Sequence, residues 1–331
     1  MKDSKNPAPS ELFTDEEKAR TFFEAKRWPD GPVCPHCGEV DNAYKLAGKT
    51  TRKGLYKCAG CREKFTVTMR SIFEDSHIPL HKWFYAIHLM CASKKGMSAH
   101  QFHRMSETFY GKKMSYRTAW FMFHRIRYAM TQHPLADKLC GIVEMDETYV
   151  GGRFRNRQPQ AVKPGERPPD RLSPFSKKAA VFSILQRDGN VRSRHVERVT
   201  AENLKPVIDS IVAEDAHVMT DSSTVLAGAL MGRKHDQVNH RAEEYVRREN
   251  GVCITTNGIE GFFATLKRGI NGTYHHVGRP YLQQYLNEFD FRYNARRISD
   301  GERTALALAA TEGKRMLLHK PVSMEGAPKI N

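Results

Sequence analysis

Four of the seven cysteines form two close pairs, and this pattern constrains the fold more than any other feature of the sequence. Cys34 and Cys37 stand in VCPHCG, Cys58 and Cys61 stand in YKCAGC, and 20 residues separate the two pairs. Each C-x2-C motif places two thiolates on one tight turn, and four thiolates complete a tetrahedron with no open position. The pattern therefore predicts one structural Zn2+ ion in a zinc ribbon over residues 30–70, with two short strands between the pairs.

Two glycines and the other three cysteines complete this interpretation. We expect Gly38 and Gly60 to serve the two metal-binding turns because glycine accepts a positive φ. Cys91, Cys140 and Cys253 have no partner at ligand spacing, so we expect them to be small apolar core residues. The N-terminal residues lack an export signal, and no apolar stretch approaches the roughly 18 residues that span a bilayer. A cytoplasmic protein without disulfides or membrane partners is expected.

The charge of the chain favours a polyanionic partner. The 331 residues include 53 Lys and Arg against 37 Asp and Glu, which gives a formal net charge of +16. Nucleic acid is the commonest partner of such a protein, although a basic soluble protein without this function has the same composition. The length allows two or three domains.

Residues 77–133 show amphipathic helical periodicity with clear start signals. Ser98 and Ser115 each precede a helical pattern and act as candidate N-caps, so three helices are expected. Between residues 78 and 131, nine Lys or Arg stand against one acid, Glu107. These features predict a helix-turn-helix-like segment that binds double-stranded DNA; a basic three-helix connector is the alternative.

In a helix-turn-helix, the last helix enters the major groove. We expect contacts near the base edges from Ser115, Tyr116 and Arg117, and contacts with phosphates from Lys112 and Lys113. Trp120, Phe121, Phe123 and Ile126 are expected in the core, whereas Arg125 and Arg127 are expected to bind DNA or to lie on a solvated helix face.

After Pro134 the pattern changes to strands, and we expect an acid at the end of each of two of them, because adjacent strands bring such ends together. Asp146 lies in the apolar stretch GIVEMDETYV, and Asp221 ends the stretch AHVMTD. A hairpin centred on residues 187–189 and an amphipathic helix separate these strands, and residues 156–178 are expected to form an exposed loop. Glu147 is a rival to Asp146 but should face the other way, because side chains alternate along a strand.

A third acid stands on a predicted helix that begins near Thr256 or Asn257. Glu260 and Lys267 are seven residues apart, so they lie on the same face of this helix. Two metal ions roughly 3.5 to 4 Å apart assist phosphodiester cleavage, and carboxylates are suitable ligands for Mg2+ or Mn2+. We expect Asp146 to bridge two such ions, Asp221 and Glu260 to bind one each, and Lys267 to bind a DNA phosphate.

At these residues the chain resembles bacterial insertion-sequence transposases of the DDE superfamily, specifically the ISXO-type group with an N-terminal zinc ribbon. The resemblance covers nearly the whole chain and is carried by RWPDGPVCPHCG, YKCAGCREKFTV, VEMDETYVGG, VMTDSS, TNGIEGFFATLKRGINGTYHHV and YLNEFDFRYNAR. It implies an α/β, RNase H-like fold with a mixed sheet, in which Asp146 lies on the first strand, Asp221 on the fourth and Glu260 on a following helix. Some relatives carry Asn at the third position, so Asn257 is an alternative or additional ligand.

The resemblance also implies a domain organisation and an activity. The expected parts are an N-terminal helix (1–29), the zinc ribbon (30–70), the DNA-binding segment (77–133), a catalytic domain (138–298) and a C-terminal tail (299–331). The expected activity is metal-dependent strand cleavage and strand transfer at the ends of an insertion sequence, by a dimer or higher oligomer on DNA. A domesticated, non-catalytic DNA-binding regulator and a nuclease that cuts without joining are the alternatives.

Overall fold

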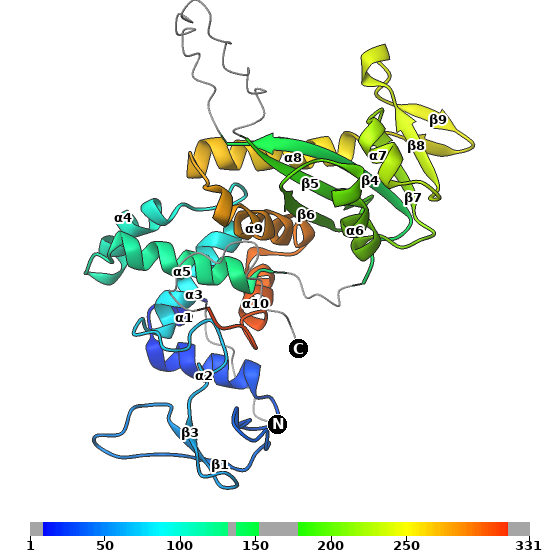
Figure 1. Cartoon of the computed structure of the whole chain (residues 1–331). Coiled ribbons are helices and arrows are strands. Elements are labelled where there is room, and N and C mark those ends of the chain that lie inside the picture. Colours follow the sequence, from blue (N-terminus) through cyan, green and yellow to red (C-terminus); the bar gives the residue numbers. More distant parts are fainter. Residues whose placement is uncertain (1–8, 132–136, 152–177, 317–331) are drawn as a thin grey trace, which may run out of the picture. The chain divides into compact units, whose positions relative to one another are not determined.

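The computed structural model describes residues 9–131, 137–151 and 178–316 (Figure 1). The described residues divide into two compact units. Unit 1 contains residues 9–131 and 295–316, and unit 2 contains residues 137–151 and 178–294. Within these residues, no helix is both long and apolar enough to cross a membrane.

Unit 1 combines a small three-stranded sheet with helices. The strands β1 (Ala43–Lys45), β2 (Tyr56–Cys58) and β3 (Lys64–Phe65) pair in this order, and both pairings are antiparallel. The helices are α1 (Pro9–Leu12), α2 (Glu16–Arg27), α3 (Leu80–Ala92), α4 (Ala99–Tyr110), α5 (Tyr116–Ala129) and α10 (Asp300–Ala309). As the capping signals indicated, the Ser98 and Ser115 side chains accept hydrogen bonds from backbone N–H groups in the first turns of α4 and α5.

Aromatic side chains form the core of unit 1. Phe73 lies edge-to-face against Phe23 and Trp83, and Phe84 lies edge-to-face against Phe23, with ring centroids 5.2 to 5.9 Å apart. All four rings are buried. Such pairs add a geometric preference to the burial of large apolar surfaces, so they fix the angle between α2 and α3.

Two arginines of α5 that we expected to bind DNA or face solvent are buried instead. Arg125 and Arg127 are 6% and 1% exposed. Arg125 donates to the carbonyl oxygens of Ile72 and Glu74 at 2.8 and 2.9 Å, so its guanidinium stabilises the loop before α3. These carbonyls come from a distant part of the sequence, and helical periodicity could not reveal them.

The segment in which we expected a C-terminal tail contains α10. Ser299 and Glu302 form a reciprocal capping box that starts this helix. The helix joins α3, because the Arg303 guanidinium donates to the Cys91 carbonyl at 2.8 Å and Thr304 Oγ1 lies 3.0 Å from His88 Nδ1. Residues 317–331 lie outside the described residues.

Unit 2 is built on a mixed five-stranded sheet, which confirms the expected α/β class. The sheet has the order β6-β5-β4-β7-β8, formed by β4 (Ile142–Val150), β5 (Ala179–Gln186), β6 (Val191–Val196), β7 (His217–Asp221) and β8 (His235–Val238). The β4–β5 and β5–β6 pairs are antiparallel, whereas the β4–β7 and β7–β8 pairs are parallel. A separate hairpin pairs β9 (Arg247–Glu249) with β10 (Val252–Ile254).

Helices cover both faces of this sheet (Figure 1). Side chains of α6 (Ala201–Ile211) and α7 (Thr224–Ala229) share one apolar core with Val143 and Met145 of β4. Side chains of α8 (Asn257–Gly269) and α9 (Leu282–Asn294) share the other core with Val150 of the same strand. The alternation along β4 therefore directs odd-numbered residues toward α6 and even-numbered residues toward α8.

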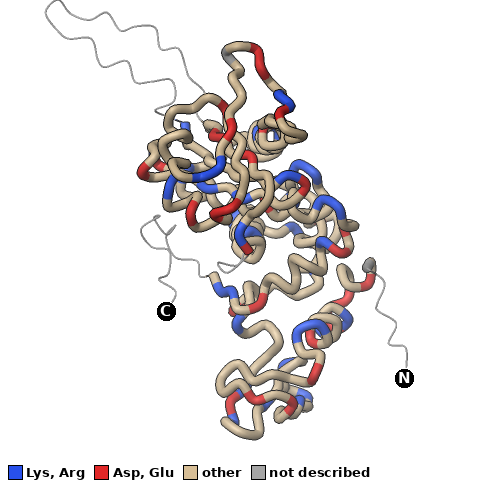
Figure 2. The backbone as a smooth tube through the Cα atoms, turned by 90° about the vertical axis from the view of Figure 1, so that its right-hand side faces the viewer, with Lys and Arg blue, Asp and Glu red and all other residues tan. Residues whose placement is uncertain are grey.

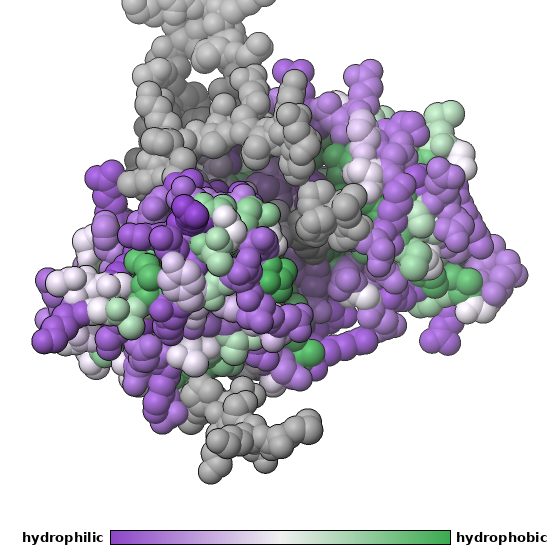
Figure 3. Space-filling view, turned by 90° about the horizontal axis from the view of Figure 1, so that it is seen from below, coloured by the Kyte–Doolittle hydropathy of each residue, from purple (hydrophilic) through white to green (hydrophobic). Residues whose placement is uncertain are grey.

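The predicted exposed loop, residues 156–178, lies outside the described residues except for Lys178. On the face of the molecule shown in Figure 3, hydrophilic residues predominate and hydrophobic residues form small, separate patches.

Candidate functional site

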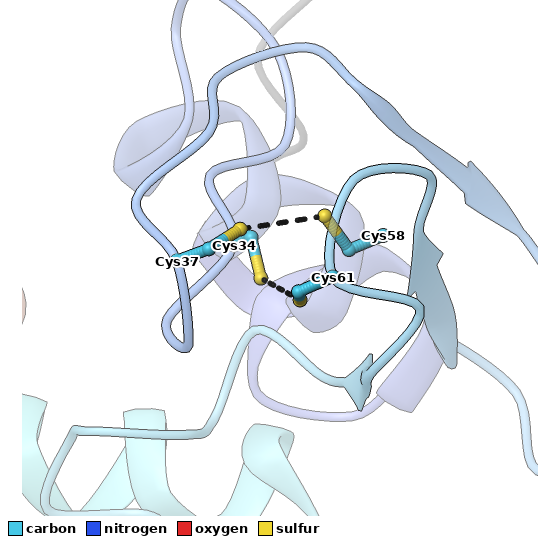
Figure 4. A group of neighbouring side chains, drawn as sticks. All are labelled: Cys34, Cys37, Cys58 and Cys61. Atoms are coloured by element: carbon cyan, nitrogen blue, oxygen red, sulfur yellow. Dashed lines mark hydrogen bonds between the residues drawn. The ribbon is translucent and has the colours of Figure 1, made fainter.

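The four paired cysteines converge on one point in unit 1 (Figure 4). The sulfur atoms of Cys34 and Cys61 lie 3.6 Å apart, as do those of Cys37 and Cys58, and all four lie within 4.8 Å of one another. Tetrahedral zinc with Zn–S distances of about 2.3 Å requires sulfur separations of about 3.8 Å. The cluster therefore fits a structural zinc ion and supports the predicted site.

Backbone hydrogen bonds shape the two cysteine turns. The Cys34 N–H donates to the Glu39 carbonyl, and the Cys58 N–H donates to the Glu63 carbonyl. Burial raises the pKa of the Cys34 thiol, but backbone N–H groups of Cys37 and His36 outweigh burial and lower it to about 7. The pKa values of Cys58 and Cys61 are raised instead: backbone N–H groups lower them, but burial and hydrogen bonds with the other thiols outweigh this in the metal-free cluster.

The two glycines of the ribbon serve different purposes. Gly38 has a φ of +83°, as expected. The expectation for Gly60 was wrong: it does not adopt a positive φ, and a Cβ at this position would instead meet the Glu39 carboxylate. Cys91 is buried as expected, but Cys140 is exposed and Cys253 is only half-buried, because Cys140 precedes β4 and Cys253 lies on the separate hairpin of β9 and β10.

In unit 2, Asp146 and Asp221 lie where two parallel strands separate. The β4–β7 pairing ends with Glu144 opposite Met219, and each aspartate lies two residues beyond the last residue of its strand in this pairing. Asp146 thus lies inside β4 rather than at its end. Both aspartates share the face of their paired neighbours, which is the face that α8 covers.

The Asp146 carboxyl is crowded by other acids. Burial raises its pKa to about 7, and the charges of Asp221, Glu147 and Glu260 add to this effect. The backbone N–H of Glu147 donates to Asp146 Oδ1 at 2.7 Å and opposes the shift only in part. Asp146, Asp221 and Glu260, the three expected metal ligands, therefore form one cluster of interacting negative charges. A divalent cation would stabilise this cluster.

Glu147 contributes to the same cluster from the opposite side of β4. The alternation of the strand places it with Val143 and Met145, as expected. Burial raises its pKa, and the charge of Asp221 adds to this. Within the described residues, its buried Oε2 atom has no hydrogen-bond partner.

Glu260 lies in the first turn of α8, and two neighbours hold one of its oxygens. The Thr256 hydroxyl donates to Glu260 Oε1 at 3.0 Å, and His240 Nε2 lies 3.2 Å from the same atom. His240 belongs to the short 3-10 helix η1 (His240–Ala242), and it is a site residue that we did not predict from the sequence. Asn257 and Lys267 are exposed on α8, like Glu260.

A buried ion pair that the sequence analysis also missed fixes the start of α8. Glu144 Oε2 accepts a hydrogen bond from the Ile259 N–H at 3.0 Å, and Arg187 donates to Glu144 Oε1 at 3.0 and 3.1 Å. Arg187 also donates to the Cys253 carbonyl at 2.7 Å. Gly258 permits this approach, because a Cβ there would lie 2.7 Å from Glu144 Oε2. Glu144 is 2% exposed, so this contact anchors the helix that carries Glu260.

The acids of unit 2 are more widely spread than the cysteines of unit 1. Among the described residues, only the four cysteines form a group of possible metal ligands whose ligand atoms all lie within 4.8 Å of one another. Two cations roughly 3.5 to 4 Å apart with one shared ligand need a wider set than a single ion does. The acidic donor set suits Mg2+ or Mn2+, which prefer oxygen ligands.

The five expected DNA contacts of unit 1 are exposed, and basic residues lie along both units (Figure 2). The Ser115 hydroxyl accepts a hydrogen bond from the Thr118 N–H at 3.1 Å, so it is engaged in capping α5. The Tyr116 ring is 46% exposed and lies 5.0 Å from the His100 ring. Trp120 and Phe121 are half-buried, whereas Phe123 and Ile126 lie in the core as expected.

Comparisons with known proteins match both parts of the chain. Residues 138–294 match the ISXO2-like transposase domain, and residues 14–64 match the transposase zinc-ribbon domain. A relative from Halobacterium salinarum, described as an uncharacterized protein in transposable element ISH50, is 24% identical over 299 residues. This match covers 86% of the chain and 92% of the relative.

Proposed function

Because the chain belongs to the ISXO2-like transposases that carry a zinc ribbon, we propose that it cuts and joins DNA at the ends of an insertion sequence. The substrate is double-stranded DNA, both at the element ends and at the target. Both steps use one active site in unit 2, and we infer that residues 138–298, which extend four residues beyond unit 2, form an RNase H-like catalytic domain. The strand positions of Asp146 and Asp221 and the helical position of Glu260 support this inference.

The catalytic groups have separate roles. The charges of Asp221 and Glu260 both act on Asp146. These three residues would hold the divalent cations, with Asp146 as a ligand of both and Asp221 and Glu260 as ligands of one each. Bound Mg2+ or Mn2+ supplies charge neutralisation at the attacking and leaving oxygens of the phosphodiester. Lys267 lies two turns after Glu260 on α8, where its ammonium binds a DNA phosphate. Asn257, one turn before Glu260, is exposed at the same end of the helix and is available as an additional oxygen ligand.

One observation carries this proposal: Asp146 and Asp221 each lie two residues beyond the end of the β4–β7 pairing, and partial burial of Asp146, together with the charges of Asp221, Glu147 and Glu260, raises its pKa to about 7. A group of like charges at one place destabilises a fold unless a cation compensates for it. Metal-dependent catalysis requires an acidic cluster of this kind, whereas a non-catalytic DNA-binding protein does not.

Unit 1 provides the DNA-binding surface. The helices α3 to α5 form a helix-turn-helix-like segment over residues 77–133, in which Tyr116 and Arg117 lie near base edges and Lys112 and Lys113 lie on phosphates. The Ser115 hydroxyl caps α5 and is therefore not free, so Ser115 contributes to the DNA-binding surface only through its exposed position at the start of the helix. The zinc ribbon stabilises the N-terminal part, and two copies of the chain pair the two ends of the element.

Cleavage of a labelled duplex that carries the flanking ends of the element tests the proposal. We expect cutting with Mg2+ in the unaltered protein and in Asp215→Asn, an exposed acid outside the cluster. Asp221→Asn should bind the duplex with similar affinity but should not cut it. Equal cutting by Asp221→Asn would overturn the assignment of the site. Tight binding without cutting by the unaltered protein, on correctly paired ends, would favour a DNA-binding regulator.

A further inference from the structure

We propose that His240 is a positioning residue for Glu260: together with Thr256 it holds one carboxylate oxygen and leaves the other for a divalent cation. This inference rests on the proposed function, because it assigns a partner to one of the proposed metal ligands. It adds a residue that lies 20 positions before Glu260 in the sequence and outside α8.

The contacts of Glu260 are one-sided. His240 Nε2 lies 3.2 Å from Glu260 Oε1, and the Thr256 hydroxyl donates to the same oxygen at 3.0 Å. His240 Nε2 also lies 3.2 Å from Thr256 Oγ1, so the three side chains form a closed triangle. In the part of the chain that the structure describes, Glu260 Oε2 makes no hydrogen bond or ion pair.

The surroundings of the imidazole determine where its proton lies. His240 Nδ1 is buried and has no hydrogen-bond partner among the described residues. A proton on Nδ1 would therefore be a buried donor without an acceptor, whereas a proton on Nε2 points at Glu260 and Thr256. With its proton on Nε2, the ring donates to Glu260 Oε1.

The ring itself is held by the segment between β8 and β10. The Tyr245 ring lies 5.3 Å from the His240 ring. The Thr255 hydroxyl donates to the Tyr245 carbonyl at 3.0 Å, and the Asn239 N–H donates to Glu244 Oε2 at 3.1 Å. The loop that carries His240 is thus held by its own hydrogen bonds, and His240 adds a second contact to a glutamate side chain that, within the described residues, is otherwise held only by the Thr256 hydroxyl.

Partners of this kind orient a metal ligand without touching the metal, and their removal typically weakens metal binding by about 10- to 100-fold. We expect His240→Leu, which removes the donor but keeps similar bulk, to weaken Mn2+ binding within this range. His240→Gln places an amide N–H near the position of Nε2 and should restore most of the affinity. The exposed His276→Leu is the matched control and should bind Mn2+ as the unaltered protein does.

The experiment measures Mn2+ binding to the full-length, zinc-loaded chain by titration calorimetry, without DNA. Equal affinity for His240→Leu and the unaltered protein would overturn the inference, and so would an equal loss in His240→Leu and His240→Gln at unchanged circular dichroism. If Glu260→Gln weakens Mn2+ binding while His240→Leu does not, the metal site stands and only the role of His240 fails. If the unaltered protein does not bind Mn2+, the proposed function fails and this inference fails with it.

Cleavage kinetics provide a second readout. Because His240 acts through the metal ligand, the His240→Leu variant should cut slowly at limiting Mn2+ and approach the normal rate at saturating Mn2+. A rate that stays depressed at saturating Mn2+ would contradict a positioning role.

Discussion

Replacing Asp146 by Asn should stabilise the metal-free protein at pH 8 and leave its stability unchanged at pH 3. The pKa of Asp146 in the folded protein is about 7, against an ordinary value of 3.8. One pKa unit corresponds to about 1.4 kcal/mol, so the ionised carboxylate costs the folded state at most about 4 kcal/mol. Solvent reaches part of the side chain and relaxation is possible, so we expect a gain of about 2 to 4 kcal/mol. The amide oxygen that replaces the carboxylate can still accept the hydrogen bond from the next N–H.

The pH dependence follows from the direction of this shift. Below pH 3.8 Asp146 is protonated in both states, so the variant has no advantage. As the pH rises toward 7, the unfolded wild-type chain releases this proton while the folded chain retains it, which progressively lowers the relative stability of the wild type. Above about pH 7 both states are ionised, and the advantage of the variant is constant.

Urea unfolding of unit 2 in Mg2+-free buffer measures this difference; zinc is retained at pH 8, whereas at pH 3 its thiolate ligands are protonated and both variants lose it alike. The three tryptophans, Trp28, Trp83 and Trp120, all lie in unit 1. Their fluorescence therefore follows unit 1, whereas far-UV circular dichroism also reports on unit 2. Asp215→Asn is the control for a simple change of net charge. An Asp146→Asn variant that is no more stable than wild type at pH 8, or equally stabilised at pH 3, would refute the electrostatic argument. Added Mg2+ should stabilise the wild type more than the variant.

Three further substitutions test other parts of the structure. Gly258→Ala should destabilise unit 2 by about 1 to 3 kcal/mol, because its Cβ would crowd the buried Glu144 carboxylate at the start of α8. Gly261→Ala on the same helix is the control: its Cβ meets nothing within 4 Å, so it should be neutral or stabilising. Equal urea midpoints for the two variants would contradict this prediction. Cys58→Ser should lower the zinc content and weaken DNA binding, whereas Cys253→Ser should change neither, as metal analysis would show. Lys112→Ala should reduce the slope of log affinity against log salt by about 0.9 in DNA-binding titrations, and an unchanged slope would exclude a phosphate contact.

Local patterns in the sequence predicted most of the elements around the candidate site. The apolar stretch GIVEMDETYV contains β4, and the acid at the end of AHVMTD is the last residue of β7. The seven-residue spacing of Glu260 and Lys267 corresponds to two exposed positions on α8. These features depend on neighbours within a few residues, which is why periodicity and capping signals suffice to find them.

The supporting contacts could not be predicted in the same way. Glu144 meets the backbone of Ile259 across 115 residues, and the Arg187 that pairs with it comes from a hairpin turn. His240 lies in a polar segment that has no periodic pattern. The capping box of α10 was the exception, since SDGE is a local signal that predicts a helix start and was overlooked.

The interrupted course of unit 1 has a consequence for the order in which the protein is made. Residues 137–294 separate the two parts of this unit, so a ribosome synthesises all of unit 2 before it reaches α10. Until then α3 lacks the contacts of Arg303 and Thr304, and the carbonyls of Ala129 and Thr131 lack the Lys314 ammonium, which donates to them at 2.6 and 2.8 Å. Chains terminated prematurely within unit 2 therefore carry an incomplete unit 1. A chain that has completed unit 1 therefore always carries the acidic residues of unit 2, because they are translated first.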